Sequence, residues 1–573
     1  MGATIIVQFY GIYYLADKSK NDFNFSADAS IYNQTELIKT LQIDNYTKNE
    51  KNFETFILKS YEKWQEASPE YLVGDFSFAL YDKEKEQLFC ARDHLGIRPF
   101  YYYHSKDLFA FSSDLDMLFS LTDIPKKPNI ASMRSLAEHR SIDHDKTMYE
   151  NIKRLPPGHS LTLKKDGILH IERYWKPELI KPDESITLQD AAQQFNTLFA
   201  EAVRCRLPAE DTVGCELSGG LDSSSVCSVA HRLTNGNIAA FSMRFGEYGC
   251  DEGPYIKAVA ENLNITPTEV SIDKVDFKNE YNMDFNYRVG PHWPVFLTYT
   301  QLFPVAKAVH ERNIKVVLTG QGGDHIMSGS RRMIMDYLKT YQWKNFFREL
   351  SALGFTKKNI KNYLLIPLLN KKQKDIIKSI LEKLHLREPT INTGLQKQPS
   401  PYNDTDTFYS EAFEHDVTIL NDAGFSTVFD SSAYHAARKL YGIEYRHPFF
   451  DIRLVEFMLS LPAEFKYSQN TIKVLLREAM KGVLPETVRE RKDKAEFSET
   501  IKDQLDAIDV EALFGNASIV DLGIVSEEKL DTYLTQYGDN ALSHTISFWT
   551  LVNLEIWLKK IKTEERQNFS LLH

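Results

Sequence analysis

The feature that most constrains the fold of this chain is the run Glu216-Leu-Ser-Gly-Gly-Leu-Asp-Ser-Ser-Ser225. The apolar-leaning residues 213–217 predict a buried strand, and the pattern that opens at the serines predicts a helix. Glycines at such a turn let backbone N–H groups approach a phosphate, and the helix N-terminus adds partial positive charge. A Gly-Ser surface turn is the simpler alternative, but the flanking strand and helix favour a phosphate-binding loop.

We interpret this loop as a site for the pyrophosphate of ATP and for the Mg²⁺ that accompanies it. Asp222 is placed to hold the metal ion, and the serine hydroxyls add hydrogen bonds to phosphate. The loop is not of the Walker type, because no Gly-Lys-Ser/Thr follows it. The residues expected to bind the nucleotide here are Leu217, Ser218, Gly219, Gly220, Leu221, Asp222, Ser223 and Ser224.

The composition is that of an ordinary folded enzyme. The 573 residues are 43% hydrophobic and 12% aromatic, which is enough for two or more domains with packed cores. The net charge of −11 argues against a nucleic-acid-binding surface. No apolar run reaches spanning length and the start of the chain lacks the pattern of a secretory signal, so we expect no membrane partner and a cytoplasmic location. The five scattered cysteines have no metal-ligand spacing.

Several blocks, in one order, resemble the ATP pyrophosphatases and in particular the asparagine-synthetase superfamily. After the loop at 216–225 they are Val317-Leu-Thr-Gly-Gln-Gly-Gly-Asp324, Arg446-His-Pro-Phe-Phe-Asp-Ile-Arg-Leu-Val-Glu-Phe457, Ile472-Lys-Val-Leu-Leu-Arg-Glu-Ala-Met480 and Arg491-Lys-Asp-Lys-Ala-Glu-Phe-Ser498. Members of this superfamily adenylate a carboxylate, release pyrophosphate and let an amine displace AMP. Chance does not explain so many blocks in register.

The resemblance implies roles for residues outside the loop. Gly320 and Gln321 should lie at the far side of the nucleotide, and Ser242 and Met243 on a second strand should lie near the adenine. Asp324 should join Asp222 at Mg²⁺. An alternative role for Asp324 is to cap the helix expected from 326 onward.

Two lysines are candidate catalytic residues. Lys494 matches the lysine of the Arg-x-x-Lys-x-x-Phe block, which in the family approaches the α-phosphate and stabilises the charge that builds there. The alternative is a solvated lysine in a charged run. Lys473 lies in a predicted helix, either as a second phosphate contact or as a side chain that reaches into solvent.

The base that would deprotonate the attacking amine is not assigned by the sequence. Asparagine-forming relatives carry Glu at the position of Gln321 and β-lactam synthetases carry Tyr, but an amide accepts no proton at neutral pH, so neither role transfers. Asp430, Tyr434 and Tyr441 are candidates by location, although each is readily explained as a structural residue.

The first part of the chain resembles the glutamine-amidotransferase domain that precedes the synthetase domain in asparagine synthetases. The blocks that carry this resemblance are Val73-Gly-Asp-Phe-Ser-Phe-Ala-Leu-Tyr-Asp82, Leu88-Phe-Cys-Ala-Arg-Asp-His-Leu-Gly-Ile-Arg-Pro-Phe100 and Arg154-Leu-Pro-Pro-Gly-His159. The resemblance implies a sandwich of two antiparallel sheets between helices. It also raises the question of whether the glutaminase site is intact.

Three parts of that glutaminase site differ from the family pattern. Working members use a cysteine directly after the first Met as nucleophile, whereas this chain begins Met1-Gly2-Ala3, and Thr4 would need prior cleavage. Asp28-Ala-Ser30 stands where the family has the Asn-Gly-Glu of the oxyanion pocket. The Arg-Gly-Pro-Asp clamp for glutamine is absent. We therefore expect a scaffold that does not hydrolyse glutamine.

A synthetase that has lost its ammonia source needs another amine. Residues 320–324 and 442–451 resemble the macrolactam synthetases of lasso peptides. That resemblance implies an enzyme that adenylates an Asp or Glu side chain of a precursor peptide and closes a ring with the N-terminal amine, with a leader peptidase as partner. The alternatives are an ammonia-dependent asparagine synthetase and a β-lactam-synthetase-like enzyme for a small molecule. The intact phosphate loop argues against a silent binding protein.

We predict an α/β protein with two domains. Residues 1–180 should form a degenerate amidotransferase-like αββα sandwich. Residues 188–573 should form the ATP-pyrophosphatase domain, in which alternating strand and helix signals predict a parallel sheet flanked by helices. Residues 331–415 are expected to be a helical insertion, which either recognises the precursor or a partner protein or is only a surface insert.

Overall fold

The structure is a computed structural model, and it describes most of the chain. The described residues are 9–15, 23–43, 53–121, 124–138, 140, 142–209, 211–275, 297–356, 359, 363, 410–493, 495, 500, 505, 508–538 and 542–571. For some helical residues only the backbone is described, at 297–301, 421–432, 536–538, 542–547 and 564–571. The start of the chain, with Met1 and Thr4, lies outside the described residues.

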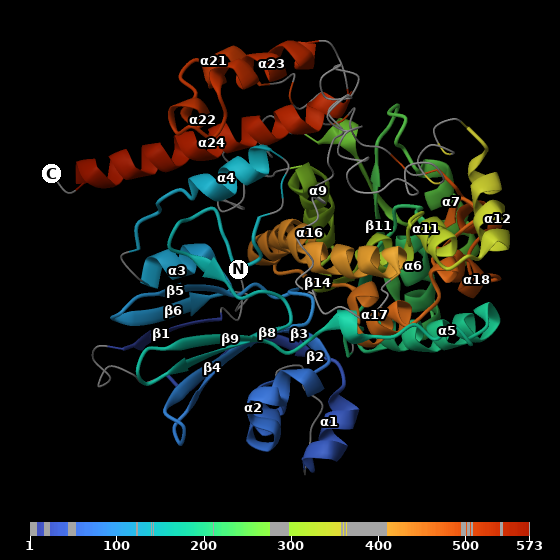
Figure 1. Cartoon of the computed structure of the whole chain (residues 1–573), viewed down its shortest axis with the longest axis horizontal. Coiled ribbons are helices and arrows are strands. Elements are labelled where there is room, and N and C mark those ends of the chain that lie inside the picture. The colour runs from blue at the N-terminus through green and yellow to red at the C-terminus, as the bar shows by residue number, and fades with distance from the viewer. Residues whose placement is uncertain are drawn as a thin grey trace.

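The N-terminal part is a sandwich of two antiparallel sheets (Figure 1). One sheet has the order β1-β6-β5-β7, with bounds Tyr10–Tyr14, Leu108–Ser112, Tyr101–His104 and Lys153–Arg154. The other has the order β2-β3-β4-β8-β9, with bounds Phe25–Ile31, Gly74–Asp82, Gln87–Arg92, His159–Lys164 and Leu169–Arg173. The predicted sandwich is confirmed.

Aromatic side chains fill the space between the two sheets. Phe9, Phe100 and Phe111 of one sheet meet Leu88 and Leu161 of the other. The helices α1 (Gln34–Leu41), α2 (Phe53–Trp64) and η3 (Gln65–Tyr71) cover the outer face of the second sheet, and α3 (Leu115–Leu121) and α4 (Ile130–Ala137) cover the first. Because β3 therefore has neighbours on both faces, it is buried from 75 to 80 instead of on alternate residues only.

The C-terminal part is built on a parallel sheet with the order β12-β11-β10-β13-β14. Its strands are Thr268–Ser271, Ile238–Arg244, Val213–Glu216, Val316–Leu318 and Glu444–Arg446 in that order. The strand predicted at 213–217 and the second strand predicted to carry Ser242 and Met243 are both present. Since β10 is central and the chain runs to either side of it, the strand order reverses next to β10, which is where ligands bind in open α/β sheets.

Helices cover both faces of the parallel sheet. One face packs on α5 (Leu188–Arg204), α6 (Leu221–Leu233), α7 (Gly253–Leu263), α10 (Gly323–Met327), α17 (Ile452–Leu459), α18 (Val474–Ala479) and α19 (Glu486–Arg489). The opposite face packs on α9 (Leu297–Glu311) and α16 (Glu411–Tyr441). The predicted fold class, a parallel sheet flanked by helices, is confirmed.

The last helix joins the two parts of the molecule. In Figure 1, α24 (Leu542–Leu571) runs across α4 of the N-terminal part. The ring of Trp557 on α24 lies 5.4 Å from the ring of Tyr149. These residues belong to one apolar core that also contains Phe303 of α9 and Ala437 of α16. A single core therefore extends from the sandwich to the parallel sheet.

Shorter elements complete the described chain. They are η4 (Pro177–Leu179), η5 (Ile272–Lys274), α11 (Met333–Lys339), α12 (Trp343–Leu353), η7 (Pro448–Phe450), η8 (Ala463–Phe465), the hairpin β15 (Tyr467–Ser468) and β16 (Thr471–Ile472), α21 (Val510–Phe514), α22 (Ser518–Asp521) and α23 (Glu527–Gly538). Within the predicted insertion, α11, α12 and the first turn of α16 are described, and 364–409 are not. None of the described helices is both long and apolar enough to cross a bilayer.

Candidate active site

The predicted phosphate loop lies at the carboxyl end of β10, where the chain turns into α6. Gly219 has a φ of +80°, and a Cβ there would lie 2.8 Å from the Cβ of Tyr255, so only glycine fits. Gly220 is the N-cap residue of α6. Because glycine offers no capping side chain, the first N–H groups of the helix remain available to a phosphate.

The serines of the loop hold its shape. The Ser223 hydroxyl accepts the Ser218 N–H at 3.1 Å and lies 2.9 Å from the Ser218 hydroxyl. The Ser218 hydroxyl accepts the Gly220 N–H at 3.2 Å. Ser224 is fully buried, and its N–H donates to the Gly220 carbonyl at 3.1 Å. Ser218 and Ser223 therefore border the turn, whereas Ser224 lies in the helix interior.

The residues predicted for the adenine side and the far side lie along the same sheet edge. The Ser242 hydroxyl donates to the Leu217 carbonyl at 2.6 Å, which ties β11 to the loop, and Met243 follows Ser242 on the strand. A Cβ on Gly320 would lie 2.6 Å from the backbone nitrogen of Ser223, so glycine lets β13 end directly against α6. The Gln321 N–H donates to the Thr319 hydroxyl at 3.1 Å.

Lys473 joins the two predicted metal-binding carboxylates. Its Nζ lies 2.5 Å from Asp222 Oδ2 and 2.7 Å from Asp324 Oδ1. Burial alone would lower the pKa of Lys473, but the two carboxylates outweigh burial and raise it. Only 6% of Lys473 is exposed, which excludes the alternative of a side chain that reaches into solvent.

The backbone at Lys473 differs from the prediction. We expected a helical residue, but Lys473 precedes α18 as its N-cap, with a φ of +59°. This left-handed conformation is uncommon for a residue with a side chain and costs free energy. Such strain persists where the surrounding structure holds a residue in place, and here two carboxylates hold the Lys473 ammonium group.

Asp222 and Asp324 fit a Mg²⁺ ion by their chemistry. Both present carboxylate oxygens, the ligand that Mg²⁺ prefers, toward one cation, the Lys473 ammonium. In the described part of the chain no third acidic, His or Cys side chain joins them, which leaves room for phosphate oxygens and water. The predicted capping role of Asp324 is wrong, because Gly322 is the N-cap of α10.

The segment that leads to Lys494 is anchored on α7. The Arg491 guanidinium donates to the carboxylate of Glu252 and lies 3.9 Å from the centre of the Tyr255 ring. An arginine that is both paired and stacked holds its segment in a defined place. Lys494 itself follows three positions later and lies outside the described residues, so its role stays a prediction.

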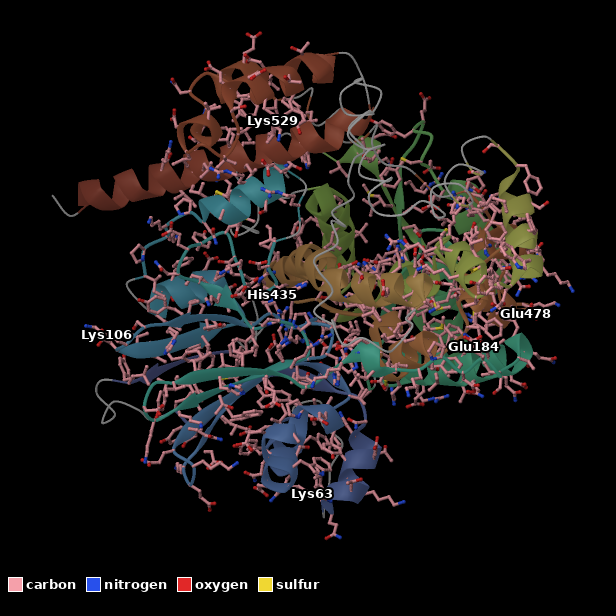
Figure 2. All side chains as sticks on the ribbon, viewed as in Figure 1. Lys63, Lys106, Glu184, His435, Glu478 and Lys529 are labelled. Atoms are coloured by element: carbon pink, nitrogen blue, oxygen red, sulfur yellow. The ribbon has the colours of Figure 1, made fainter. Side chains whose placement is uncertain are left out.

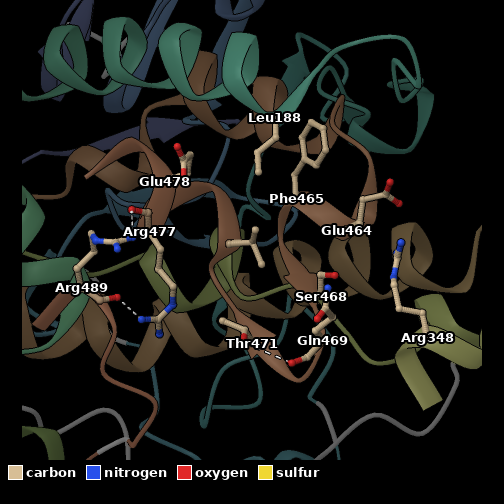
Figure 3. A pocket seen from close by; sticks show the side chains of 11 residues that line it. Leu188, Arg348, Glu464, Phe465, Ser468, Gln469, Thr471, Arg477, Glu478 and Arg489 are labelled. Atoms are coloured by element: carbon tan, nitrogen blue, oxygen red, sulfur yellow. Dashed lines mark hydrogen bonds between the residues drawn. The ribbon is translucent and has the colours of Figure 1, made fainter. Parts of the chain in front are cut away.

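Arg477 holds the same segment by hydrogen bonds to backbone carbonyls. It donates to the carbonyl of Ile472 at 3.0 Å, to that of Arg491 at 2.8 Å and to that of Arg489. Arg477 and Arg489 line a hollow of about 490 Å³ beside α18 (Figure 3). Arg489 is also paired with Glu486 at 2.7 Å. The arginines of this hollow are therefore engaged with protein oxygens, and we place the active site at the sheet edge.

Of the candidates for the base, Tyr434 packs against residues of β14 and of the turn that follows it. Its ring is 4.7 Å from the ring of Tyr445 and 4.9 Å from that of His447, near the carboxyl end of β14. Tyr441 lies beside His310, three residues before β14 begins, and its role stays a prediction. The side chain of Asp430 lies outside the described residues.

Strand β2, which carries Asp28 and Ser30, is bonded to the C-terminal part. Asp28 accepts two hydrogen bonds from Arg438, at 2.9 and 2.8 Å. Arg98 lies 3.6 Å from Asp28 and 3.1 Å from Glu444. The Ser30 hydroxyl donates to Glu444 at 3.0 Å. We call these five residues the junction cluster.

The junction cluster is charged, with Asp28 and Arg98 buried at its centre and its other members partly buried. Burial raises the pKa of Asp28, but Arg438 and Arg98 outweigh burial and hold that pKa below its usual range. Figure 2 shows His435, one turn before Arg438 on α16, in the middle of the molecule, whereas Lys63 and Lys106 lie at its periphery. The cluster thus occupies the space between the sandwich and the parallel sheet.

The anchoring role of Arg491 and the junction cluster were not predicted from the sequence. A signal was present, because Glu444 and Arg446 flank an apolar residue in a short strand, and charged residues inside a predicted strand need partners. The partners, Arg98 and Arg438, are distant in the sequence, so no local pattern identifies them.

Comparisons with known proteins agree with this geometry. A family model described as "Asparagine synthase" matches residues 194–559, more than half of the chain, and one described as "Glutamine amidotransferase domain" matches residues 17–175. Asparagine synthetase [glutamine-hydrolyzing] 3 of Bacillus subtilis (strain 168) is 26% identical, over 84% of this chain and 78% of that protein. Asparagine synthetase [glutamine-hydrolyzing] 1 of the same organism is 24% identical, over 94% and 85%.

A third relative covers less of the chain. It is a putative asparagine synthetase [glutamine-hydrolyzing] 2 of Methanocaldococcus jannaschii, 29% identical over 56% of this chain and 61% of that protein. The phosphate loop, the paired carboxylates and the family match lead to one conclusion. The chain belongs to the asparagine synthase family and is an ATP-dependent ligase that forms amide bonds.

Proposed function

We propose that this protein adenylates an Asp or Glu side chain of a precursor peptide and closes a macrolactam ring with the peptide's own N-terminal amine, releasing AMP and pyrophosphate. The observation that carries the proposal is the contrast between two sites. The carboxylates that hold Lys473 remain at the open edge of the parallel sheet. The strand that the family uses for glutamine hydrolysis is engaged by the junction cluster.

The adenylation step follows from the residues at the sheet edge. The turn at Gly219 and the N-terminus of α6 hold the phosphates, and glycine at 320 lets β13 end directly against the first turn of α6. The ammonium of Lys473 neutralises charge on the phosphates as the substrate carboxylate attacks the α-phosphate. Mg²⁺ held by Asp222 and Asp324 would neutralise further charge on the departing pyrophosphate.

The proposed reaction differs from asparagine formation in the source of the amine. Ammonia derived from glutamine would need an oxyanion pocket on β2. Here Asp28 and Ser30 are directed into ion pairs and hydrogen bonds with α16 and β14. An amine already present on the adenylated molecule removes the need for an ammonia source. The likeness of residues 320–324 and 442–451 to lasso-peptide cyclases supports a peptide substrate and a leader peptidase as partner.

One specific observation favours a second candidate. The relatives that match most of the chain are named as asparagine synthetases. An enzyme that uses free ammonium and aspartate would need the same adenylation site and no glutaminase. A small-molecule synthetase of the β-lactam type is the remaining alternative.

Pyrophosphate exchange with the purified protein tests the proposal. Wild type is incubated with ATP, Mg²⁺ and either L-aspartate or a synthetic peptide with a free N-terminal amine and one Asp side chain. We expect peptide-dependent exchange and a product lighter by one water, without glutamine. Exchange and amide formation with aspartate and ammonium alone would instead establish the second candidate. Release of glutamate from added glutamine would contradict the proposed loss of glutaminase activity.

A further inference from the structure

Glu216 is a carboxyl group at a position where a parallel sheet usually carries an apolar side chain. It is the last residue of β10, directly before the phosphate loop. Strands of parallel sheets are near-continuous apolar runs, and buried glutamate without a partner is rare. Among the described residues, no hydrogen bond or opposite charge compensates its burial. The residue is half-buried, so part of it remains accessible.

The strand register places Glu216 on the sheet face covered by α9 and α16. Val213 and Cys215 pack into the core on the opposite face. Because side chains alternate along a strand, Gly214 and Glu216 face the other way. A Cβ on Gly214 would lie 2.9 Å from Val317, which belongs to the core beneath α9 and α16.

Three neighbouring strands end at the same level with polar residues. Cys215 pairs with Leu318, and Leu318 pairs with Arg446. Glu216, Thr319 and His447 are therefore the next residues of three adjacent strands. The Thr319 hydroxyl lies 2.7 Å from His447 Nδ1. This polar row lies at the carboxyl edge of the sheet, where open α/β sheets bind their substrates.

Tyr445 adds a fourth polar group on this face, two residues before His447. It is 5% exposed, and its hydroxyl has no hydrogen-bond partner among the described residues. Burial, and next the charge of Glu216, raise the pKa of Tyr445 well above its usual value. Tyr445 and Glu216 are therefore electrostatic neighbours.

The other groups at this edge are poor proton acceptors. Burial, with Arg206 and Arg98 nearby, lowers the pKa of His447 to about 3, so the imidazole is neutral and weakly basic. The tyrosines Tyr434 and Tyr445, which face this end from α16 and β14, are proton donors in their neutral form. The amide of Gln321 accepts no proton.

We propose that Glu216 accepts the proton of the attacking amine and thereby selects a cationic amine as the acyl acceptor. The inference rests on the amide-forming activity proposed above and names the base for it. Asp222 and Asp324 do not compete for this role, since both are bonded to Lys473.

The proton and bond changes balance. The ammonium form of the amine gives one proton to the Glu216 carboxylate and becomes a nucleophile. Its nitrogen forms the C–N bond to the acyl carbon, and the C–O bond to AMP breaks. The second proton leaves with the AMP phosphate, and Glu216 releases its own to solvent. Burial raises the pKa of Glu216 to about 8. An α-amino group has a pKa of roughly 7.7–8.0, so the transfer costs little free energy.

Separating the two half-reactions tests the proposal. Glu216→Gln and Glu216→Leu are compared with wild type and with Glu261→Gln, a control on the exposed face of α7. The acids are the Asp-containing peptide and L-aspartate. Pyrophosphate exchange reports adenylation, and amide formation with the peptide amine or with ammonium reports transfer. Hydroxylamine, which is neutral at pH 7, traps the acyl-adenylate as a hydroxamate without a base.

We expect both Glu216 variants to keep exchange and hydroxamate formation and to lose amide formation by ~10²–10⁴-fold. The rise of the wild-type transfer rate through pH 8 should disappear, and Glu261→Gln should behave as wild type. Amide formation at the wild-type rate in Glu216→Gln would overturn the assignment of the base alone. Equal loss of hydroxamate would assign Glu216 a structural role. Absence of exchange in wild type with either acid would remove the proposed function, and this inference with it.

Discussion

The candidate active-site cluster of Lys473, Asp222 and Asp324 and the junction cluster are built alike, and they differ in the exposure of one carboxylate. In each, a cation lies between two carboxylates, Lys473 between Asp222 and Asp324, and Arg98 between Asp28 and Glu444. The difference lies at one carboxylate of each: the Asp324 side chain is 45% exposed and that of Asp28 is 3% exposed, whereas Asp222 and Glu444 are partly buried at 15% and 22%. An accessible pair can exchange its cation for a metal ion and a phosphate. An enclosed pair can only hold its surroundings together.

The largest effect, on the rate of pyrophosphate exchange, is expected at the accessible pair, Asp222 and Asp324 around Lys473. Asp222→Asn removes a charge that a bound Mg²⁺ would need and weakens the hold on Lys473, so the rate of pyrophosphate exchange should fall by about 10²–10³-fold. The fold should be unchanged by circular dichroism, and Lys481→Met, an exposed lysine after α18, is the control. Exchange close to the wild-type rate in Asp222→Asn would mean that the nucleotide binds elsewhere.

A substitution at the enclosed pair, Asp28 and Glu444 around Arg98, should lower stability and leave catalysis unchanged. Arg98→Met removes one partner from a buried pair and leaves Asp28 and Glu444 with less compensation, which should cost about 3–5 kcal/mol of unfolding free energy. Urea unfolding followed by tryptophan fluorescence measures the loss. The exchange rate of the folded fraction should stay near that of wild type. A variant with normal stability and impaired exchange would show that the two sites are not independent.

Lowering the pH should reduce the contribution of the junction cluster to the unfolding free energy, and not that of the apolar core. Burial alone would raise the pKa of both Asp28 and Glu444. Nearby arginines outweigh burial and lower both pKa values in the folded protein, Arg438 and Arg98 at Asp28 and Arg446 and Arg98 at Glu444. A lowered pKa contributes stability that is complete above the unfolded value, roughly pH 4, and is lost as the pH falls below it. The difference in unfolding free energy between wild type and Arg98→Met should therefore shrink between pH 5 and pH 3. A constant difference would contradict the charged state of the cluster.

The smallest effect is expected at Ser30. Its hydroxyl bonds to Glu444, which keeps two arginine partners when the hydroxyl is removed. Ser30→Ala should cost about 0.5–1.5 kcal/mol by urea unfolding. Thr197→Ala, on the exposed side of α5, provides a control for the loss of a hydroxyl. A cost as large as that of Arg98→Met would show that the hydroxyl, not the charges, organises the cluster.

The phosphate loop of the candidate active site was predictable from the sequence, and the junction cluster was not. The phosphate loop, β10 and α6 follow one another along the chain, so local patterns identify them. The position of Lys473 beside Asp222 depends on contacts across 251 residues, which no local pattern records. The left-handed backbone at Lys473 and the N-cap of α10 were missed for the same reason, because tertiary contacts override local preference there.

The shared core beneath α24 has a consequence for how this molecule can be handled. Trp557 and Tyr149 belong to opposite parts of the chain, and each covers apolar surface that the other part would otherwise expose to water. A fragment that ends near residue 180 would therefore expose this apolar surface and should aggregate, even though the sandwich resembles a separate domain. Swapping the N-terminal half for that of a relative will need the last helix to be exchanged with it.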